Sequence, residues 1–93
     1  MRVRVQFYGQ LRTALGRAAE EVELPEGCTA AVLIEQLAAQ FSAASNHLLS
    51  SSGDVASGLL VVVNDAAVAA SQLSAKQLLH GDVISLLPPI AGG

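Results

Sequence analysis

In this 93-residue chain, only one segment has apolar residues at helical spacing over a length sufficient to cover a sheet. From Ala30 to about Phe41, apolar side chains recur at three- and four-residue intervals. Residues 25–27 before it have turn chemistry, and Thr29 is a suitable N-cap. The chain is too short for two domains, so the other segments have to supply the sheet that this stripe covers. The stripe consists of Leu33, Ile34, Leu37 and Phe41.

The remaining periodic segments have the pattern of strands. Residues 1–8 alternate, with Val3, Val5 and Phe7 on one face, and residues 19–24 alternate again. Residues 59–63 form a continuous apolar run, typical of a strand buried on both faces. A short strand at 66–69 and a last strand at 83–87 follow, the last one with Ile84 and Leu86 inward and suited to a central place beside the first.

The links between the strands carry weaker signals. Helical turns are expected at 10–15 and 43–49, a helical piece within 73–79, and a variable loop over most of 42–58. The order of elements predicts the α+β class. More specifically, it predicts a β-grasp roll, a mixed sheet of about five strands with one main helix across it.

The C-terminus has the composition of a reactive tail. The last strand runs through Pro88 and Pro89, which favour an extended approach, into Ile90, Ala91, Gly92 and Gly93. The two glycines would let the terminal carboxylate enter a narrow cleft and meet ATP. An acyl-adenylate formed there could pass its carbonyl to sulfide, a thiol or an amine. The alternative is a solvated chain end. We therefore expect one domain over residues 1–93, with 88–93 as its flexible, extended reactive tail.

Composition excludes several other classes of function. The net charge is −3 and the five basic residues form no run, which argues against nucleic-acid and membrane-surface binding. Cys28 is the only cysteine, so neither an intrachain disulfide nor a Cys/His metal site is expected. We assign Cys28 a partly buried place, and His47 and His80 surface or turn roles. Without a signal-peptide pattern at the start, a cytoplasmic location is expected.

Several short motifs together resemble the MoaD family of ubiquitin-like sulfur carriers, and the resemblance spans nearly the whole chain except residues 42–58. MoaD is the small subunit of molybdopterin synthase, and the thiamine carrier ThiS shares its diglycine end. The motifs are Tyr8-Gly9-Gln10-Leu11-Arg12, Ala14-Leu15-Gly16, Leu24-Pro25-Glu26-Gly27, Val63-Asn64, Gly81-Asp82-Val83-Ile84 and Leu87-Pro88-Pro89-Ile90-Ala91-Gly92-Gly93.

The resemblance implies a cycle in which Gly93 is the only residue with a chemical role. A MoeB-like adenylyltransferase would use ATP to adenylate its carboxylate, and a sulfurtransferase would convert it to a thiocarboxylate. In a MoaE-like large subunit, within a heterotetramer, that group would give sulfur to cyclic pyranopterin monophosphate. Residues 88–92 would guide the tail into the partner. The chain would bind no cofactor or metal and would not be catalytic on its own. Apolar docking residues are expected at Phe7, Leu59, Val83 and Leu87.

Three functions remain open at this level. The first is the sulfur carrier of molybdopterin synthesis, or a ThiS-like carrier for another pathway. The second is a ubiquitin-like modifier joined through Gly93 to lysines of other proteins, for which Lys76 is the only lysine available for self-linked chains. The third, an interaction domain with an inert tail, is disfavoured by the resemblance.

Overall fold

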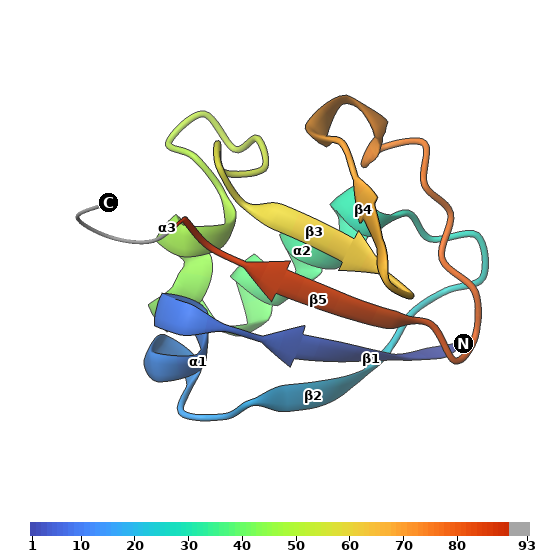
Figure 1. Ribbon diagram of the computed structural model, residues 1–93, viewed down its shortest axis with the longest axis horizontal. Coiled ribbons are helices and arrows are strands. Elements are labelled where there is room, and N and C mark those ends of the chain that lie inside the picture. The colour runs from blue at the N-terminus through green and yellow to red at the C-terminus, as the bar shows by residue number, and fades with distance from the viewer. Residues whose placement is uncertain (90–93) are drawn as a thin grey trace.

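Five strands form one mixed sheet in the order β2-β1-β5-β3-β4, which can be followed from the bottom to the top of Figure 1. The computed structural model describes residues 1–89. At the centre of the sheet, β1 (Arg2–Phe7) runs parallel to β5 (Val83–Leu87). The outer strands are all antiparallel to their neighbours: β2 (Ala19–Glu23), β3 (Leu60–Val63) and β4 (Ala66–Val68). This is the predicted β-grasp, with the last strand beside the first.

The helices lie on one side of the sheet and at its ends. The main helix, α2 (Ala30–Gln40), begins at Thr29, whose hydroxyl accepts a hydrogen bond from the amide of Val32 at 3.3 Å. Short helical turns follow it at η1 (Ser42–Ala44) and α3 (Ser45–Leu48), and α1 (Gly9–Leu15) follows β1. The helical piece expected within 73–79 was misplaced, because the 3-10 turn η2 forms at Ala70–Gln72.

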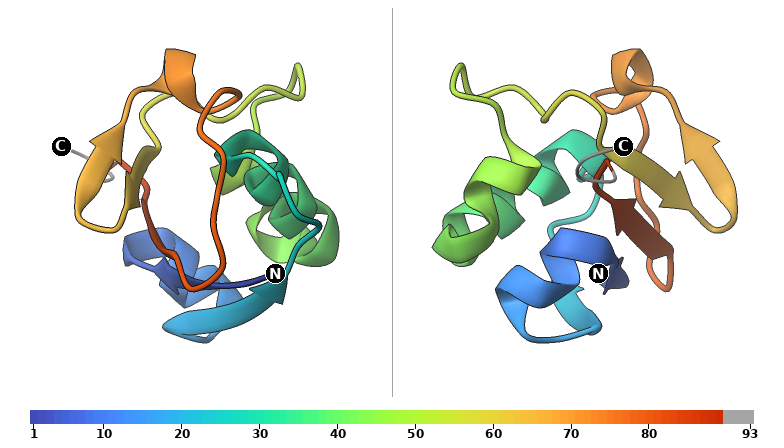
Figure 2. Two further views of the ribbon diagram at one scale, coloured as in Figure 1. Left: turned by 90° about the vertical axis from the view of Figure 1, so that its right-hand side faces the viewer. Right: turned by 60° about the vertical axis from the view of Figure 1, so that its left-hand side comes forward.

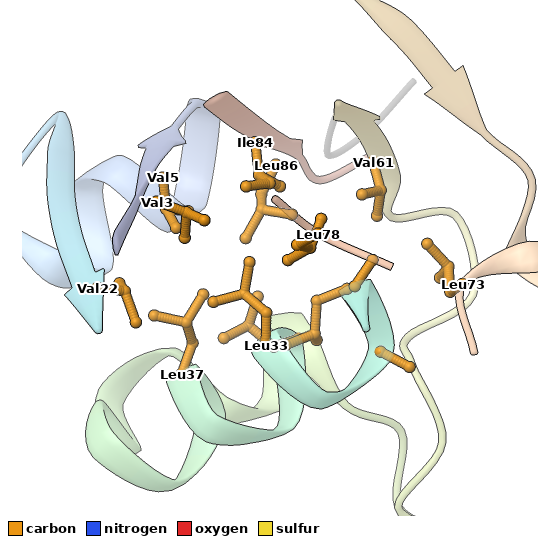
Figure 3. Close-up of a cluster of buried hydrophobic side chains, with 14 of the residues drawn as sticks. Val3, Val5, Val22, Leu33, Leu37, Val61, Leu73, Leu78, Ile84 and Leu86 are labelled. Atoms are coloured by element: carbon orange, nitrogen blue, oxygen red, sulfur yellow. The ribbon is translucent and has the colours of Figure 1, made fainter. Parts of the chain in front are cut away.

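The core lies between the inner face of the sheet and α2, as Figure 3 shows. Val3, Val5, Ile84 and Leu86 point from the central strands toward the helix, and each is at most 1% exposed. Each such side chain contributes about 1.5–3 kcal/mol by leaving water. From the helix, Leu33, Ile34 and Leu37 fill the facing positions and are fully buried. The predicted stripe is therefore confirmed for these three residues, while Phe41 is half-buried beneath the Arg17 guanidinium.

Two sequence-based expectations about burial were wrong. β3 is covered on one face only, since Leu60 is 46% exposed and Val62 is half-buried. The physical reason is that α2 packs on the inner face of the sheet, so the outward side chains of β3 keep contact with water (Figure 2). Phe7, expected as a docking residue, is 1% exposed. It shares the inward face with Val3 and Val5, as the period of two requires.

A hydrogen-bond network fixes the start of β5. Asp82, the one buried charged side chain of the described residues, accepts from the Asn64 amide at 2.7 Å and from the Leu79 backbone N–H at 2.8 Å. Asn64 in turn accepts from the backbone N–H of Val83 at 2.9 Å and adopts a positive φ of 50°. The turn after β3 is thereby tied to the entry of β5. This gives a structural role to the Val63-Asn64 and Gly81-Asp82 motifs.

Candidate functional site

The root of the tail continues the register of β5 beyond the sheet. Phe7 pairs with Leu86 and Leu60 with Leu87, so the next chain positions bring Gly9 beside Pro88 and Gly58 beside Pro89. A Cβ added at Gly9 would lie 3.5 Å from Pro88 Cγ, and one added at Gly58 would lie 3.4 Å from Pro89 Cγ. The diproline is thus held between two backbone segments that are distant in sequence. The tail root is the name we use for Pro88 and Pro89 in this setting.

Glycine is favoured at both flanking positions by backbone conformation, while an added Cβ would make only ordinary van der Waals contact with the prolines. Gly9 has φ +56° and Gly58 has φ +83°, both in the region that L side chains rarely adopt. Pro88 and Pro89 continue β5 out of the sheet between these two glycines. The fold therefore aims the last described residues away from the sheet along the direction of its central strand (Figure 1).

An apolar surface lies on the open face of the sheet next to the tail root. We call it the apolar sheet face, and it consists of Leu60, Val62, Val83 and Leu87. Leu60 pairs with Leu87 across β3 and β5, so their side chains share one face close to the point where the chain leaves the sheet. Of the docking residues expected from sequence, Val83 and Leu87 belong to this surface, each half-buried. Leu59 is also half-buried but packs against the core.

Polar and charged side chains border the apolar sheet face on the β1 and β2 side. Gln6 Oε1 accepts hydrogen bonds from the Tyr8 hydroxyl at 3.1 Å and from Ser85 Oγ at 3.3 Å. Beyond it, Arg2 donates to Glu23 at 2.7 Å. This hydrogen bond lowers the pKa of Glu23 below its ordinary value. One half of the open face is thus apolar and the other half carries paired charges.

A groove of about 570 Å³ opens beside the tail root. It is formed by α1, by His47 of α3 and by both prolines, and its α1 residues are Gly9, Gln10, Thr13 and Ala14. The Thr13 hydroxyl donates to the Gly9 carbonyl oxygen at 3.3 Å within the helix. His47 is half-buried and lines this groove together with both prolines. The structure thus places it beside the tail root, although no sequence pattern linked it to the tail.

The other residues singled out from sequence lie away from the tail root. Cys28 is 8% exposed, which confirms the partly buried place expected for it. His80 is exposed and its Nδ1 accepts from the backbone N–H of Arg2 at 3.0 Å. Among residues 1–89, no group of three or more His, Cys, Asp or Glu side chains is arranged to hold a metal. Ile90, Ala91, Gly92 and Gly93 lie outside the described residues.

Comparison with known proteins identifies the group to which the chain belongs. A family model for the ThiS family matches residues 5–93. The chain belongs to the ThiS family. Ubiquitin-like sulfur carriers make up this family, so the resemblance carried by the sequence motifs is confirmed. No curated protein matches the chain. Within the part of the chain that the structure describes, no helix is long and apolar enough to cross a membrane.

Solved structures reproduce the fold of this ThiS-family chain from end to end. SAMP1 from Haloferax volcanii has a TM-score of 0.88 at 20% identity, covering 100% of both chains. A candidate molybdopterin converting factor, subunit 1, from Pyrococcus furiosus has a TM-score of 0.75 at 26% identity, covering 97% of this chain and 99% of that one. A chain of the Amycolatopsis orientalis BexX/CysO complex has a TM-score of 0.71 at 27% identity, covering 98% and 99%.

Besides the place of His47, sequence reasoning missed Leu60, Val62 and Gly58 as residues of the site. Leu60 and Val62 lie in an apolar run, and such a run does not by itself tell an exposed apolar face from a buried one. The alternation of these two with buried Val61 and Val63 appears only when the helices are seen to cover one side. Gly58 gave no signal, because its contact with Pro89 follows from the pairing of β3 with β5.

Proposed function

We propose that this chain is a sulfur carrier that serves as the small subunit of molybdopterin synthase. In this proposal a partner adenylates the Gly93 carboxylate with ATP, and a sulfurtransferase replaces the adenylate by sulfur. The resulting thiocarboxylate gives its sulfur to cyclic pyranopterin monophosphate to build the dithiolene. The chain acts as one domain in the cytoplasm, where ATP is available, and residues 88–93 are its tail. It supplies sulfur and is not a catalyst on its own.

The observation that carries this proposal is the position of the tail root at the end of a central strand. β5 is bonded on both sides, to β1 and β3, so it is among the most firmly held elements of the fold. Pro88 and Pro89 extend it between Gly9 and Gly58. The tail root therefore leaves the sheet in a defined direction, which supports a tail that must enter another protein's active site.

The apolar sheet face supports a protein partner for the same site. Leu60 and Leu87 lie beside the point where the tail leaves the sheet. A MoaE-like large subunit or a MoeB-like adenylyltransferase could therefore bind this surface and the tail at the same time. The relative with 27% identity was solved in a complex of CysO with BexX. The relative with 26% identity bears the name of a molybdopterin converting factor, which favours the large subunit as the partner.

A second candidate function is the same carrier chemistry with another acceptor. The BexX/CysO relative supports it, because that structure is a complex of CysO with BexX and its name mentions no molybdopterin converting factor. In this case Gly93 would still be adenylated and thiocarboxylated, and only the docking partner and the sulfur acceptor would differ. Conjugation of Gly93 to lysines of other proteins is the third outcome that an experiment must separate.

The test is to replace the gene in its native host by a version that lacks the Gly93 codon. We expect the mutant strain to lose its molybdenum-dependent enzyme activities and to grow as before in medium that lacks thiamine. In the parent strain we expect no conjugates of this chain to lysines of other proteins. The matched control is Ser52→Ala, a change in an exposed loop. Purified chain incubated with adenylyltransferase, sulfurtransferase and ATP should gain the mass difference between sulfur and oxygen. Retained molybdoenzyme activity in the strain that lacks Gly93 would refute the proposal, and a thiamine requirement would support the second candidate.

A further inference from the structure

The strong nucleophiles of this chain are few, and all of them lie at one end of the fold. The sequence contains one lysine, Lys76, and one cysteine, Cys28, besides the α-amine of Met1. Any of these three could attack an activated carboxyl terminus of the same molecule. Their location therefore decides whether the acyl group that the proposed function requires can be lost to self-capture.

The parallel pairing of β1 with β5 places the α-amine at the far end of the molecule. Both strands run toward the tail root, so Met1, which precedes β1, lies at the opposite end of the sheet (Figure 1). The Met1 ammonium donates to the Leu24 carbonyl oxygen at 2.7 Å. The turn before β5 lies there as well, since the backbone N–H of Gly81 donates to the carbonyl oxygen of Arg2 at 2.8 Å.

The lysine and the cysteine are tied to this same end through the turn that leads into β5. The backbone N–H of Leu78 donates to the Cys28 carbonyl oxygen at 2.9 Å. The Lys76 carbonyl oxygen accepts from the N–H of Ala30 at 2.9 Å, at the first residue of α2. The other end of α2 leads into η1, which packs on α1 beside the tail root. The whole length of α2, about 16 Å, and then η1 therefore lie between the Lys76 backbone and the elements beside the tail root.

The tail is too short to reach the α-amine of Met1, and Lys76 and Cys28 are tied to the same end of the fold as Met1. At about 3.3 Å per residue, the strand from Val83 to Pro89 spans about 20 Å, and Met1 lies about 10 Å beyond the level of Val83. Residues 90–93 can span at most about 14 Å from Pro89, whatever their conformation. The terminal carbonyl therefore cannot reach the α-amine of Met1, which lies about 30 Å from Pro89 along the sheet in a molecule whose longest extent is 37 Å.

The polar side chains that line the groove at the tail root form no lasting acyl bond at neutral pH. The groove beside it carries the Gln10 amide, the Thr13 hydroxyl and the His47 imidazole. Thr13 donates its hydroxyl proton to the Gly9 carbonyl oxygen, so no base activates it as a nucleophile. Acylation of an imidazole gives a product that water readily hydrolyses.

We infer that the fold holds its own amine and thiol groups out of reach of its activated terminus, so that only a second molecule can capture the acyl group. The inference rests on the proposed activation of Gly93. Self-capture would form a bond from an amine nitrogen or thiol sulfur to the Gly93 carbonyl carbon and break the bond from that carbon to the adenylate oxygen. AMP would leave, and the nucleophile would lose a proton. Segregation of the nucleophiles prevents this step and leaves the acyl group for an external sulfur donor.

The test uses the chain prepared as a C-terminal thioester of a small thiol, which requires no adenylating enzyme. After free thiol is removed, intact mass reports self-capture as a product one water lighter than the free acid. The wild type should give only the free acid by hydrolysis. Gln10→Cys places a thiol in the groove beside the tail root, and Gln77→Cys places the same thiol at the far end. Both native side chains are exposed, so the two variants are matched.

A short tether gives an effective concentration in the millimolar range, so the ring thioester should form at least about tenfold faster in Gln10→Cys than in Gln77→Cys. Circular dichroism confirms that both variants fold. A ring product in the wild type, mapped by proteolysis to Lys76, Cys28 or Met1, would overturn the inference, and so would equal rates in the two variants. Failure of enzymatic thiocarboxylation would instead refute the proposed function and leave these outcomes unchanged.

Discussion

Replacing Asp82 by alanine should destabilise the protein more than any other change of a single charged side chain among the described residues. Asp82 is 9% exposed, and its carboxylate accepts from the Asn64 amide at 2.7 Å and the Leu79 backbone N–H at 2.8 Å. A hydrogen bond to a charged group contributes about 1.5–3 kcal/mol, and alanine leaves both donors without this partner. Since water can reach the remaining exposed edge, we take the lower value for each bond and expect a loss of about 3 kcal/mol.

Urea unfolding followed by circular dichroism measures this loss as a shift of the midpoint at constant slope. Asp54→Ala is the control, because Asp54 is exposed in the serine-rich loop and its carboxylate accepts only from Ser52 Oγ, at 3.3 Å. It should change the free energy of unfolding by less than about 0.5 kcal/mol. Asp82→Asn should fall between the two, because it keeps one acceptor oxygen but turns a second donor toward Asn64. A loss below about 1 kcal/mol for Asp82→Ala would refute the view that this network holds the entry of β5.

Three further changes test the core, the docking surface and the charged border. Leu37→Ala removes a fully buried side chain and should cost about 2–5 kcal/mol in urea unfolding, whereas Val32→Ala on the exposed side of α2 should stay within about 0.5 kcal/mol. Leu60→Ser should weaken binding of the purified large subunit at least about tenfold by calorimetry. Val32→Ser, at 44% exposure against 46% for Leu60, should leave that binding unchanged; equal effects would contradict docking at the apolar sheet face. The lowered pKa of Glu23 means that its pairing with Arg2 stabilises the fold above the ordinary Glu pKa and is lost as pH falls through the lower, folded-state pKa. In an NMR titration the Glu23 pKa should rise toward its ordinary value in Arg2→Gln, and an unchanged pKa would show that the ion pair is not its cause.

Local sequence patterns were sufficient to predict the class of fold and the buried faces of the first strand and the main helix. The period of two in residues 1–8 and the helical spacing of Leu33, Ile34 and Leu37 identify which side chains are buried, because each pattern depends only on the geometry of its own element. The same reasoning should have excluded Phe7 from docking, since it shares a face with Val3 and Val5. That error came from carrying a docking role over from the family without applying the strand period.

The remaining features depend on which elements meet, and local patterns do not contain that information. Residues 59–63 are apolar throughout, and only the placement of the helices on one side of the sheet leaves Leu60 exposed there. Gly58 and His47 come from segments whose periodicity is weak, so nothing in the sequence linked them to Pro88 and Pro89. Their proximity follows from the pairing of β3 with β5 and from the turn of the chain through α3.

The sequence by itself determined that this chain ends in a diglycine after two prolines, that it has a single lysine and a single cysteine, and that its elements suit a β-grasp. Tertiary structure alone decided how those features are arranged in space. Parallel pairing of β1 with β5 puts the tail root at one end of the sheet and Met1, with Cys28 and Lys76 near it, at the other. The physical reason is that strand order and direction are set by long-range backbone hydrogen bonds and by burial of a shared face, and both involve residues far apart in the chain.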